Sequence, residues 1–202
     1  MFARIRGGDA SGSFDWLILG LGNPGRRYER TRHNVGEDAV RLLAERLDAN
    51  LRTGRNDAAV AETRITDSRV VLAVPLTFMN ESGRAAASLV KRFKLTDPER
   101  IIVVHDELDL EPGVVRVKAG GGLAGHNGLR SITSALSTQD YLRIRIGVGK
   151  PSSAARGADH VLSRIPARER EVLDVSVEIA ADAVRSIVTR GAAETMQDIN
   201  SR

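Results

Sequence analysis

Short apolar runs alternate with amphipathic segments along most of this chain of 202 residues, and this alternation restricts the possible folds. Six apolar runs predict buried or half-buried strands, at Trp16–Leu21, Ala59–Ile65, Val70–Val74, Ile101–Val104, Val114–Lys118 and Tyr141–Val148. Helical spacing predicts helices at Val35–Leu47, at Ser82–Phe93, from about Gly128, and from about Ala167 to Thr189 with a short helical tail after it. The pattern predicts an α/β fold: a single domain with a mixed, largely parallel twisted sheet flanked by helices.

The composition fits one folded domain with an ordinary core. Hydrophobic residues make up 42% and charged residues 28%, while aromatic residues are only 3%, so Val, Leu, Ile and Ala must fill the interior. The chain contains no cysteine. Disulfides, thiolate zinc sites and a cysteine nucleophile are therefore excluded, and the composition suits a reducing compartment.

Charge and hydropathy limit the partners that the chain can have. Lys and Arg outnumber Asp and Glu by 30 to 26, which permits an RNA partner without requiring one. No apolar run approaches the roughly 20 residues that span a bilayer, so no membrane partner is expected. Residues 1–14 lack the apolar centre of a secretory signal and are predicted to form a flexible N-terminal tail, which leaves 15–202 as the domain.

A glycine motif directly after the first strand suggests a dinucleotide site. Residues 20–25, GLGNPG, match the pattern G-x-G-x-x-G. That site needs a helix packed on the sheet within the motif and an acidic residue at the end of a second strand about 20 residues later. The segment that follows, RRYERTRHN, has no apolar face, and Glu45 lies inside a predicted helix. The motif therefore indicates a tight turn, not a nucleotide-dependent oxidoreductase.

Polar side chains follow the predicted strands. Asn23 follows the first strand, Asn80 follows the strand that ends near Val74, and Asp106 follows Ile101–Val104. His33 and Asn127 each precede a predicted helix. Ligands bind beyond the carboxyl ends of strands in open α/β sheets, so these groups are expected to converge. Neutral amides, one imidazole and one carboxylate are typical of a hydrolytic site that needs no metal.

Four stretches resemble the signatures of bacterial-type peptidyl-tRNA hydrolase, in the same order and with the same spacing. They are GLGNPGRRYERTRHNVG, PLTFMNESG, HDELDLEPG and GGGLAGHNGLRSI, and the resemblance covers about residues 16–200. It implies an enzyme that cleaves the ester between a peptide, or an N-blocked amino acid, and tRNA. It also implies a cytoplasmic monomer that binds peptidyl-tRNA and uses no cofactor and no metal.

The resemblance assigns catalytic roles to four residues. His33 would be the general base, and its place before a helix would oppose the imidazolium form and favour a neutral ring. Asp106 would orient that ring. Asn80 would stabilise the oxyanion, while Asn23, together with Asn127, would hold the peptide backbone. The alternative for Asn80 and Asn127 is that each caps the helix that follows it, and both roles can coexist.

Further residues would bind the two parts of the substrate. Phe78 and Met79 would line the cleft, and Tyr28 would shape it or contact the end of the tRNA. Lys118, Arg143 and Arg145, on the strands that flank the glycine-rich loop, would bind the tRNA, and the resemblance places Lys118 and Arg145 on a clamp for the 5′ phosphate. The alternative is that these cations form a solvated strand face. The family usually has glycine where this chain has Ala124, so we expect a stiffer loop or a different φ preference at this position.

The sequence also suggests a metal site and a non-catalytic function. His105, Asp106, Glu107 and Asp109 suggest a metal site, but neighbouring strand residues point to opposite faces and no typical ligand spacing occurs, so a metal is not expected. A non-catalytic RNA-binding relative of the same fold is the second function considered. Such a protein would not need His33, Asp106 and three asparagines together, and the hydrolase is therefore preferred.

Overall fold

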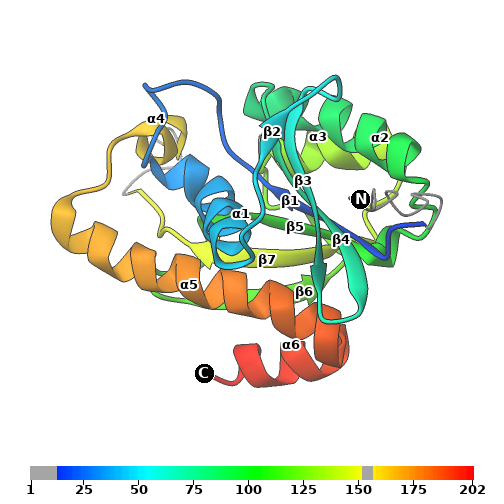
Figure 1. Cartoon of the computed structure of the whole chain (residues 1–202). Coiled ribbons are helices and arrows are strands. Elements are labelled where there is room, and N and C mark those ends of the chain that lie inside the picture. The colour runs from blue at the N-terminus through cyan, green and yellow to red at the C-terminus, as the bar shows by residue number, and fades with distance from the viewer. Residues whose placement is uncertain (1–12, 152–156) are drawn as a thin grey trace, which may run out of the picture.

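A seven-stranded sheet with the order β2-β3-β4-β1-β5-β7-β6 forms the centre of the computed structural model, which describes residues 13–151 and 157–202 (Figure 1). The strands are β1 (Trp16–Gly20), β2 (Arg52–Thr53), β3 (Ala58–Ile65), β4 (Ser68–Pro75), β5 (Ile101–Glu107), β6 (Val115–Ala119) and β7 (Leu142–Gly147). The four central strands β4, β1, β5 and β7 are parallel, whereas β2, β3 and β6 pair antiparallel at the edges. The predicted mixed sheet with a parallel centre is confirmed.

Six helices lie in the described ranges. They are α1 (Val35–Arg46), α2 (Ser82–Phe93), α3 (Asn127–Leu136), α4 (Gly157–Leu162), α5 (Ala167–Arg190) and α6 (Ala192–Asn200). Short 3₁₀ turns precede two helices and one strand, at η1 (Arg32–Asn34), η2 (Met79–Glu81) and η3 (Pro98–Arg100). All of the predicted helices are present. The short helix α4 was not predicted, because six residues with one buried valine carry too weak a periodicity.

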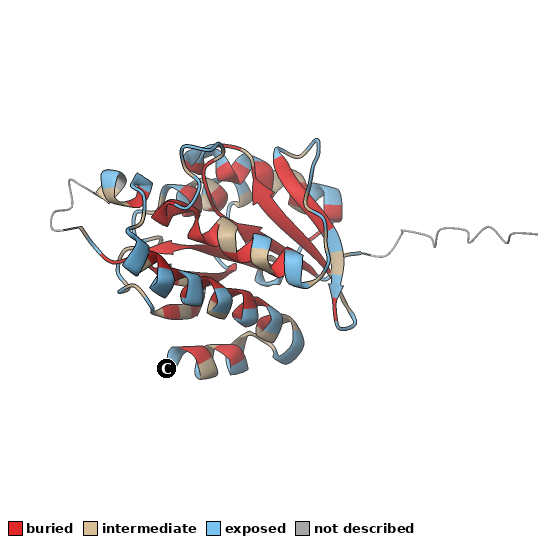
Figure 2. Ribbon diagram, turned by 60° about the vertical axis from the view of Figure 1, so that its left-hand side comes forward, coloured by how far each residue is buried: buried red, intermediate tan, exposed pale blue. Residues whose placement is uncertain are grey.

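The two faces of the sheet carry separate apolar clusters, because successive side chains of a strand point to opposite sides. Ile18 and Ile102 pack with α1 and α5 on one face. Leu19 and Val103 pack with α2 and α3 on the other face. Figure 2 shows the buried sheet between these helical layers. Both faces are covered, so the central strands read as continuous apolar runs.

The N-terminal prediction is partly outside the described residues. Phe14 was placed in the flexible tail, yet its ring packs on Phe93 with the centroids 4.9 Å apart, and Asp15 bonds the backbone N–H of Arg69 at 2.7 Å. The fold therefore begins earlier than expected, while residues 1–12 lie outside the described ranges. Among the described residues, no helix has the length and apolar character needed to cross a membrane.

One glycine permits α1 to approach the sheet directly beneath the polar residues. A Cβ on Gly36 would stand 2.2 Å from the carbonyl oxygen of Val104 and 3.0 Å from the nitrogen of Leu21. These two atoms are themselves hydrogen-bonded at 3.0 Å. A side chain at this position must displace either the helix or the junction of β1 and β5.

We expect Gly36→Ala to lower the free energy of unfolding by roughly 1–3 kcal/mol, because the added methyl group overpacks a closed contact. Chemical denaturation measures the change. Gly54→Ala is the matched control, because nothing lies within 4 Å of its added Cβ and its φ is not positive. Equal unfolding midpoints for the two variants would contradict the close approach of α1.

Candidate active site

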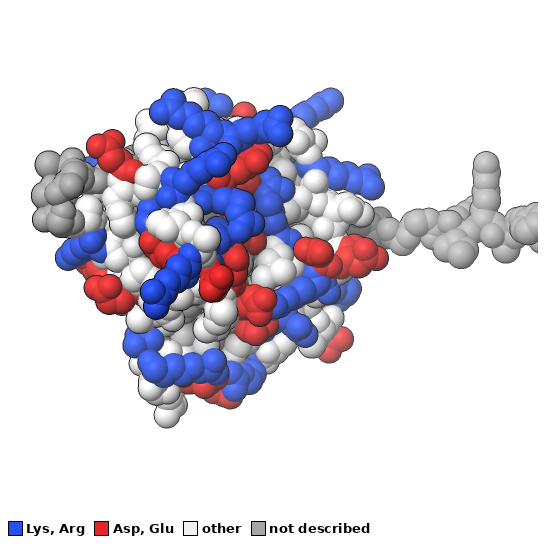
Figure 3. All heavy atoms as spheres, turned by 90° about the vertical axis from the view of Figure 1, so that its left-hand side faces the viewer, with Lys and Arg blue, Asp and Glu red and all other residues white. Residues whose placement is uncertain are grey.

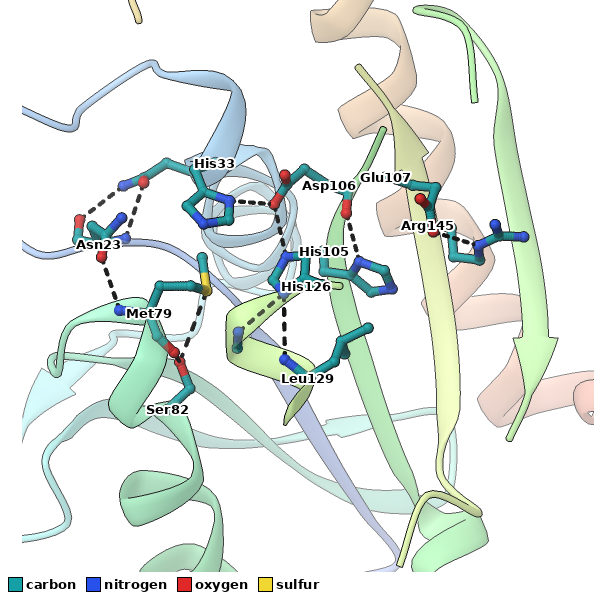
Figure 4. Close-up of polar contacts among 12 residues, drawn as sticks. Asn23, His33, Met79, Ser82, His105, Asp106, Glu107, His126, Leu129 and Arg145 are labelled. Atoms are coloured by element: carbon teal, nitrogen blue, oxygen red, sulfur yellow. Dashed lines mark hydrogen bonds and ion pairs between the residues drawn. The ribbon is translucent and has the colours of Figure 1, made fainter. Parts of the chain in front are cut away.

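Asn23, His33 and Asp106 lie together at the carboxyl ends of β1, β4 and β5 (Figure 4), and Asn127 lines one cleft with His33 and Asp106. Asn23 follows β1, and Met79 and Asn80 lie in η2 after β4. Asp106 differs from the prediction in one respect: β5 continues through Glu107, so the triplet His105-Asp106-Glu107 lies inside the strand and is buried. The crevice beyond parallel strands therefore begins at a buried carboxylate.

A buried imidazole and this carboxylate form the centre of the site. The Nδ1 atom of His33 lies 2.8 Å from Oδ1 of Asp106, and the two residues are 9% and 2% exposed. His33 belongs to η1, directly before α1. Because Nδ1 donates its proton to the carboxylate, the proton-free Nε2 of the neutral ring is left to act as a base.

A second imidazole, His126, contacts the same carboxylate oxygen and was missed in the sequence. Its Nε2 lies 3.0 Å from Oδ1 of Asp106. Its Nδ1 accepts hydrogen bonds from the backbone N–H groups of Gly128 and Leu129, at 3.1 and 3.3 Å, and so caps α3. An accepting Nδ1 leaves the ring proton on Nε2, which therefore donates to Asp106.

The two imidazoles determine the charges in the cluster. Burial alone would raise the pKa of Asp106, but His33 and His126 outweigh it and hold that pKa well below the usual value. Burial opposes the imidazolium form of His33, yet the attraction of Asp106 wins and raises the pKa of His33 above 6.5. The expectation that the helix N-terminus would govern this ring is thereby corrected: the carboxylate governs it.

His105 stays neutral beneath this cluster. Its ring is fully buried and lies 5.0 Å from the ring of His126. Burial, reinforced by the neighbouring His126, lowers the pKa of His105 well below its usual value. Its Nδ1 donates to the backbone oxygen of Asp106 at 2.6 Å. His105 therefore supports the strand at Asp106 without adding a competing positive charge.

Asn34 holds Asn23 in place instead of capping α1. Its Oδ1 accepts from the backbone N–H of Asn23, and its Nδ2 donates to the Asn23 carbonyl, both at 3.0 Å. The predicted start of the helix is correct, but the capping bond expected from Asn34 and Glu37 is absent; their side chains bond each other at 3.0 Å. Asn23 in turn accepts from the backbone N–H of Met79 at 2.8 Å, which leaves its Nδ2 without a bond within the described ranges.

The capping alternative fails for both remaining asparagines. The side chain of Asn80 does not cap α2, whose N-cap residue is Glu81, and His126 caps α3 in place of Asn127. Both asparagines are exposed, and Oδ1 of Asn127 accepts a short hydrogen bond from Arg130. Their amides are therefore accessible to solvent, and Asn127 lines the cleft that contains His33.

The residues predicted to line the cleft differ in burial: Phe78 and Tyr28 are at the surface, and Met79 lies in the core. Phe78 is 53% exposed and packs edge-on against Tyr28, with the ring centroids 6.4 Å apart. Met79 is only 4% exposed, and a Cβ on Gly128 would stand 2.5 Å from its sulfur. Phe78 and Tyr28 therefore present an aromatic surface, while Met79 packs η2 against α3.

A cleft of about 220 Å³ opens at the imidazole pair. Its lining includes His33, Asp106 and the segment 124–127 on one side, and Gly157 and Val161 of α4 on the other. Ala124 has a φ of +48°, a left-handed conformation that costs roughly 1–2 kcal/mol for a residue with a Cβ. The chain thus keeps the backbone shape of a glycine here despite the substitution.

Comparisons with known proteins agree with this geometry. The peptidyl-tRNA hydrolase family model matches residues 17–202. The peptidyl-tRNA hydrolase of Frankia alni is 52% identical, with 87% of this chain and 89% of that protein covered. The enzyme of Cutibacterium acnes is 46% identical, with 92% and 98% covered. A crystal structure of peptidyl-tRNA hydrolase from Acinetobacter baumannii superposes with a TM-score of 0.88 at 37% identity, covering 94% and 97% of the two chains.

The chain belongs to the peptidyl-tRNA hydrolase family. Three of the stretches that carried the resemblance in the sequence line the cleft, and the fourth contacts Asn23 through the backbone N–H of Met79.

The basic residues predicted for tRNA do not share one environment. Arg143 is 1% exposed and donates to the carbonyls of Gly120, Gly121 and Gly122. The prediction that Arg143 binds the tRNA is corrected, because its guanidinium is buried beneath the glycine-rich loop that it holds. Lys118 is half-buried, and Arg145 pairs with the buried Glu107 at 3.0 Å while keeping 21% of its side chain exposed.

The cluster could also be considered as a metal site. Among the described residues, ligand atoms of His33, Asp106 and His126 all lie within 4.8 Å of one another. However, the two ring nitrogens that face Asp106 carry protons in the network, and the other nitrogen of His126 caps α3. The arrangement fits a hydrogen-bonded relay, since a metal would have to displace both protons.

The cluster predicts the direction of a pH dependence. An imidazole accepts a proton only when it is deprotonated. If His33 is the base, we expect activity to rise with pH through a midpoint above the ordinary pKa of histidine, because the pKa of His33 is raised. In Asp106→Asn burial acts on His33 without the carboxylate, and we expect the midpoint to move to lower pH while the maximal rate falls. The measurement is kcat/KM against pH for both proteins. An identical midpoint in the two proteins would show that Asp106 does not influence the pKa of His33.

The two contacts of His126 can be separated by substitution. His126→Ala removes the α3 cap and a donor to Asp106, so we expect about 1 kcal/mol less stability and turnover roughly 10-fold or more lower. His126→Asn retains a good capping group but not the contact with Asp106. It should restore thermal stability and leave turnover low; recovery of both would assign His126 to the helix alone.

Proposed function

We propose that this chain hydrolyses the ester that joins a peptide, or an N-blocked amino acid, to the 3′ ribose of tRNA. Membership of the peptidyl-tRNA hydrolase family supports the reaction. The observation that carries the mechanism is the His33–Asp106 contact of 2.8 Å at the end of an open cleft. A neutral imidazole oriented by a carboxylate is a general base for water.

The proton transfers follow from this geometry. His33 takes a proton at Nε2 from water, and the water oxygen attacks the ester carbonyl carbon. Asp106 stays ionised and stabilises the resulting imidazolium. The tetrahedral intermediate then collapses, the bond to the ribose oxygen breaks, and His33 returns the proton to that oxygen. The products are a peptide carboxylate and a tRNA with a free 3′ hydroxyl.

The asparagines contribute neutral donors around the ester. Asn80 is proposed to donate to the developing oxyanion, and the unused Nδ2 of Asn23 points to the same catalytic role. Asn127 is proposed to bond the peptide main chain, with Tyr28 and Phe78 forming the apolar side of the substrate site. Met79, which was predicted to line the cleft, is left out because it is buried between η2 and α3. Amides that bond main-chain groups do not depend on the peptide sequence, which suits a substrate of any composition.

Lys118 and Arg145 are the proposed phosphate clamp of the tRNA. Val117 belongs to the cluster on the α1 and α5 face, so Lys118 projects from the opposite face, and Arg145 lies on that same face through the register of β6 with β7. Arg143 is left out of the clamp because it is buried. Phosphate contacts give affinity without reading sequence.

We further propose that the enzyme is a cytoplasmic monomer without cofactor or metal. The hydrogen bonds already made by the two imidazoles support a metal-free reaction. The large exposed hydrophobic residues of the described ranges are few, which supports a monomer: Phe78, Leu162, Val172 and Val175. The absence of cysteine suits a reducing compartment. A non-catalytic RNA-binding relative is not favoured, because binding alone uses neither imidazole.

Release of an N-acetylated amino acid from its tRNA, measured in EDTA without nucleotides, tests the proposal. His33→Ala should lower turnover by roughly 10²–10⁴-fold, the usual contribution of a general base, while tRNA binding persists. His160→Gln is the matched control, because His160 is the one histidine outside the Asp106 cluster and, among the described residues, its imidazole bonds only the carbonyl of Val148, at 3.1 Å. Near-normal turnover of His33→Ala would remove it from the mechanism, and loss of wild-type activity in EDTA would contradict the metal-free proposal.

A further inference from the structure

A second depression, of about 250 Å³, lies beside the turn that carries His33. It is lined by Arg26, Glu29, Arg30, Arg164, Ile165 and Arg170. Lys and Arg side chains gather on this face of the molecule in Figure 3, which looks onto the side that carries α4 in Figure 1. We call these six residues the arginine depression.

Two chain segments about 130 residues apart are joined to build it. Thr31 and Arg164 form an isolated antiparallel bridge. The adjacent Arg32, whose side chain is 7% exposed, donates to Oγ of Ser163 at 2.8 Å and pairs with both oxygens of Glu169 at 2.6 and 2.7 Å. Arg32 thereby holds the segment of Arg30 against the segment of Arg164. The two arginines are therefore close to each other before any ligand binds.

Most of the positive charge in the arginine depression is not neutralised. Among the described residues, Arg26 and Arg164 have no carboxylate within 4 Å, and both are exposed. The pair between Arg30 and Asp174 is 3.9 Å long and exposed on both sides, so it is weak. Arg170 is already bound by Asp38 and Asp174. Three guanidinium groups thus line the arginine depression with one lining carboxylate, that of Glu29, and the only further carboxylate paired with any of the three among the described residues is the distant Asp174.

We propose that the arginine depression binds a backbone phosphate of the tRNA, at a site separate from Lys118 and Arg145; this inference rests on the proposed function. Planar guanidinium groups bind phosphate oxygens in pairs. Arg26 follows Asn23 by three residues and Arg30 precedes His33 by three, so an RNA whose ester lies at His33 is brought against them.

The two phosphate sites lie on different sides of the reacting ester. The clamp residues project from the sheet face that α2 and α3 cover. The arginine depression includes Arg170 of α5, which pairs with Asp38 of α1, and these two helices cover the other face. A tRNA held at both sites is fixed in orientation about the ester, and neither contact reads a base.

The test is tRNA affinity as a function of salt. Uncharged tRNA is titrated with the wild-type protein and with a triple variant carrying Arg26→Gln, Arg30→Gln and Arg164→Gln. We expect the dissociation constant of the triple variant to rise roughly tenfold near 0.15 M salt and the slope of log K against log[salt] to fall by about 1, as for loss of one phosphate contact. With N-acetylaminoacyl-tRNA as substrate, KM should rise and kcat should stay unchanged.

Arg64→Gln is the matched control, because Arg64 is an exposed arginine on the hairpin at the amino end of β4, the opposite edge of the sheet. Wild-type affinity and slope in the triple variant would overturn the proposal, as would an equal loss in Arg64→Gln, which would indicate net charge alone. Thermal unfolding verifies the fold. If the triple variant is unstable, the single variant Arg26→Gln repeats the test, because the Arg26 side chain has no ion pair with any described residue. Absence of hydrolysis by the wild-type protein would instead refute the proposed function, since the tRNA titration is independent of turnover.

Discussion

The active site depends on one ionised carboxylate that has almost no contact with water. Asp106 is 2% exposed, and a buried charge is tolerated only where donors replace its hydration. His33 and His126 supply these donors to the same oxygen, at 2.8 and 3.0 Å. They come from the turn before α1 and the start of α3, so the carboxylate binds together elements from the two opposite helical layers. A shift of α1 or of α3 would therefore change the hydrogen bonds to Asp106, and with them the basicity of His33.

The packing beneath the site explains how loops can hold such a network. Gly36 allows α1 to pack directly against the junction of β1 and β5. This contact determines how far His33, in the turn before α1, lies from the sheet. Asn34 brackets the backbone of Asn23, and Asn23 bonds the backbone of Met79, so the ends of β1 and β4 are connected through amides. On the outer side Arg32 connects the same turn to α4 and α5. Loops at the edge of a sheet acquire the rigidity of the sheet through these contacts.

The sequence was sufficient for the long helices and the six longer strands, and for the meeting of His33 and Asp106 at the strand ends, because period and strand polarity are local properties. It was not sufficient for the two-residue strand β2 and the short helix α4. It was insufficient where a side chain has several possible partners. Asn34 stands at a capping position but bonds Asn23, and His126 caps a helix although histidine is not a preferred cap. Arg143 shows the strand alternation of an exposed cation, yet its guanidinium lies under three glycine carbonyls. Alternation identifies the face on which a side chain lies, and only the fold shows whether a loop covers that face.

The raised pKa of His33 poses a conflict that the surrounding groups resolve. The Asp106 charge makes His33 a stronger base but also favours the imidazolium, which cannot accept a proton. Burial acts in the opposite direction and limits the rise, and the neutral His105 below the cluster adds no charge of its own. The proposed donors around the ester are likewise uncharged amides, whereas the cations proposed to bind phosphate, in the arginine depression and at Lys118, are not among the residues that line the cleft. Under this proposal the charge that attracts the polyanion is kept out of the cleft that contains the imidazole, and the protonation of His33 is left to Asp106 and to burial.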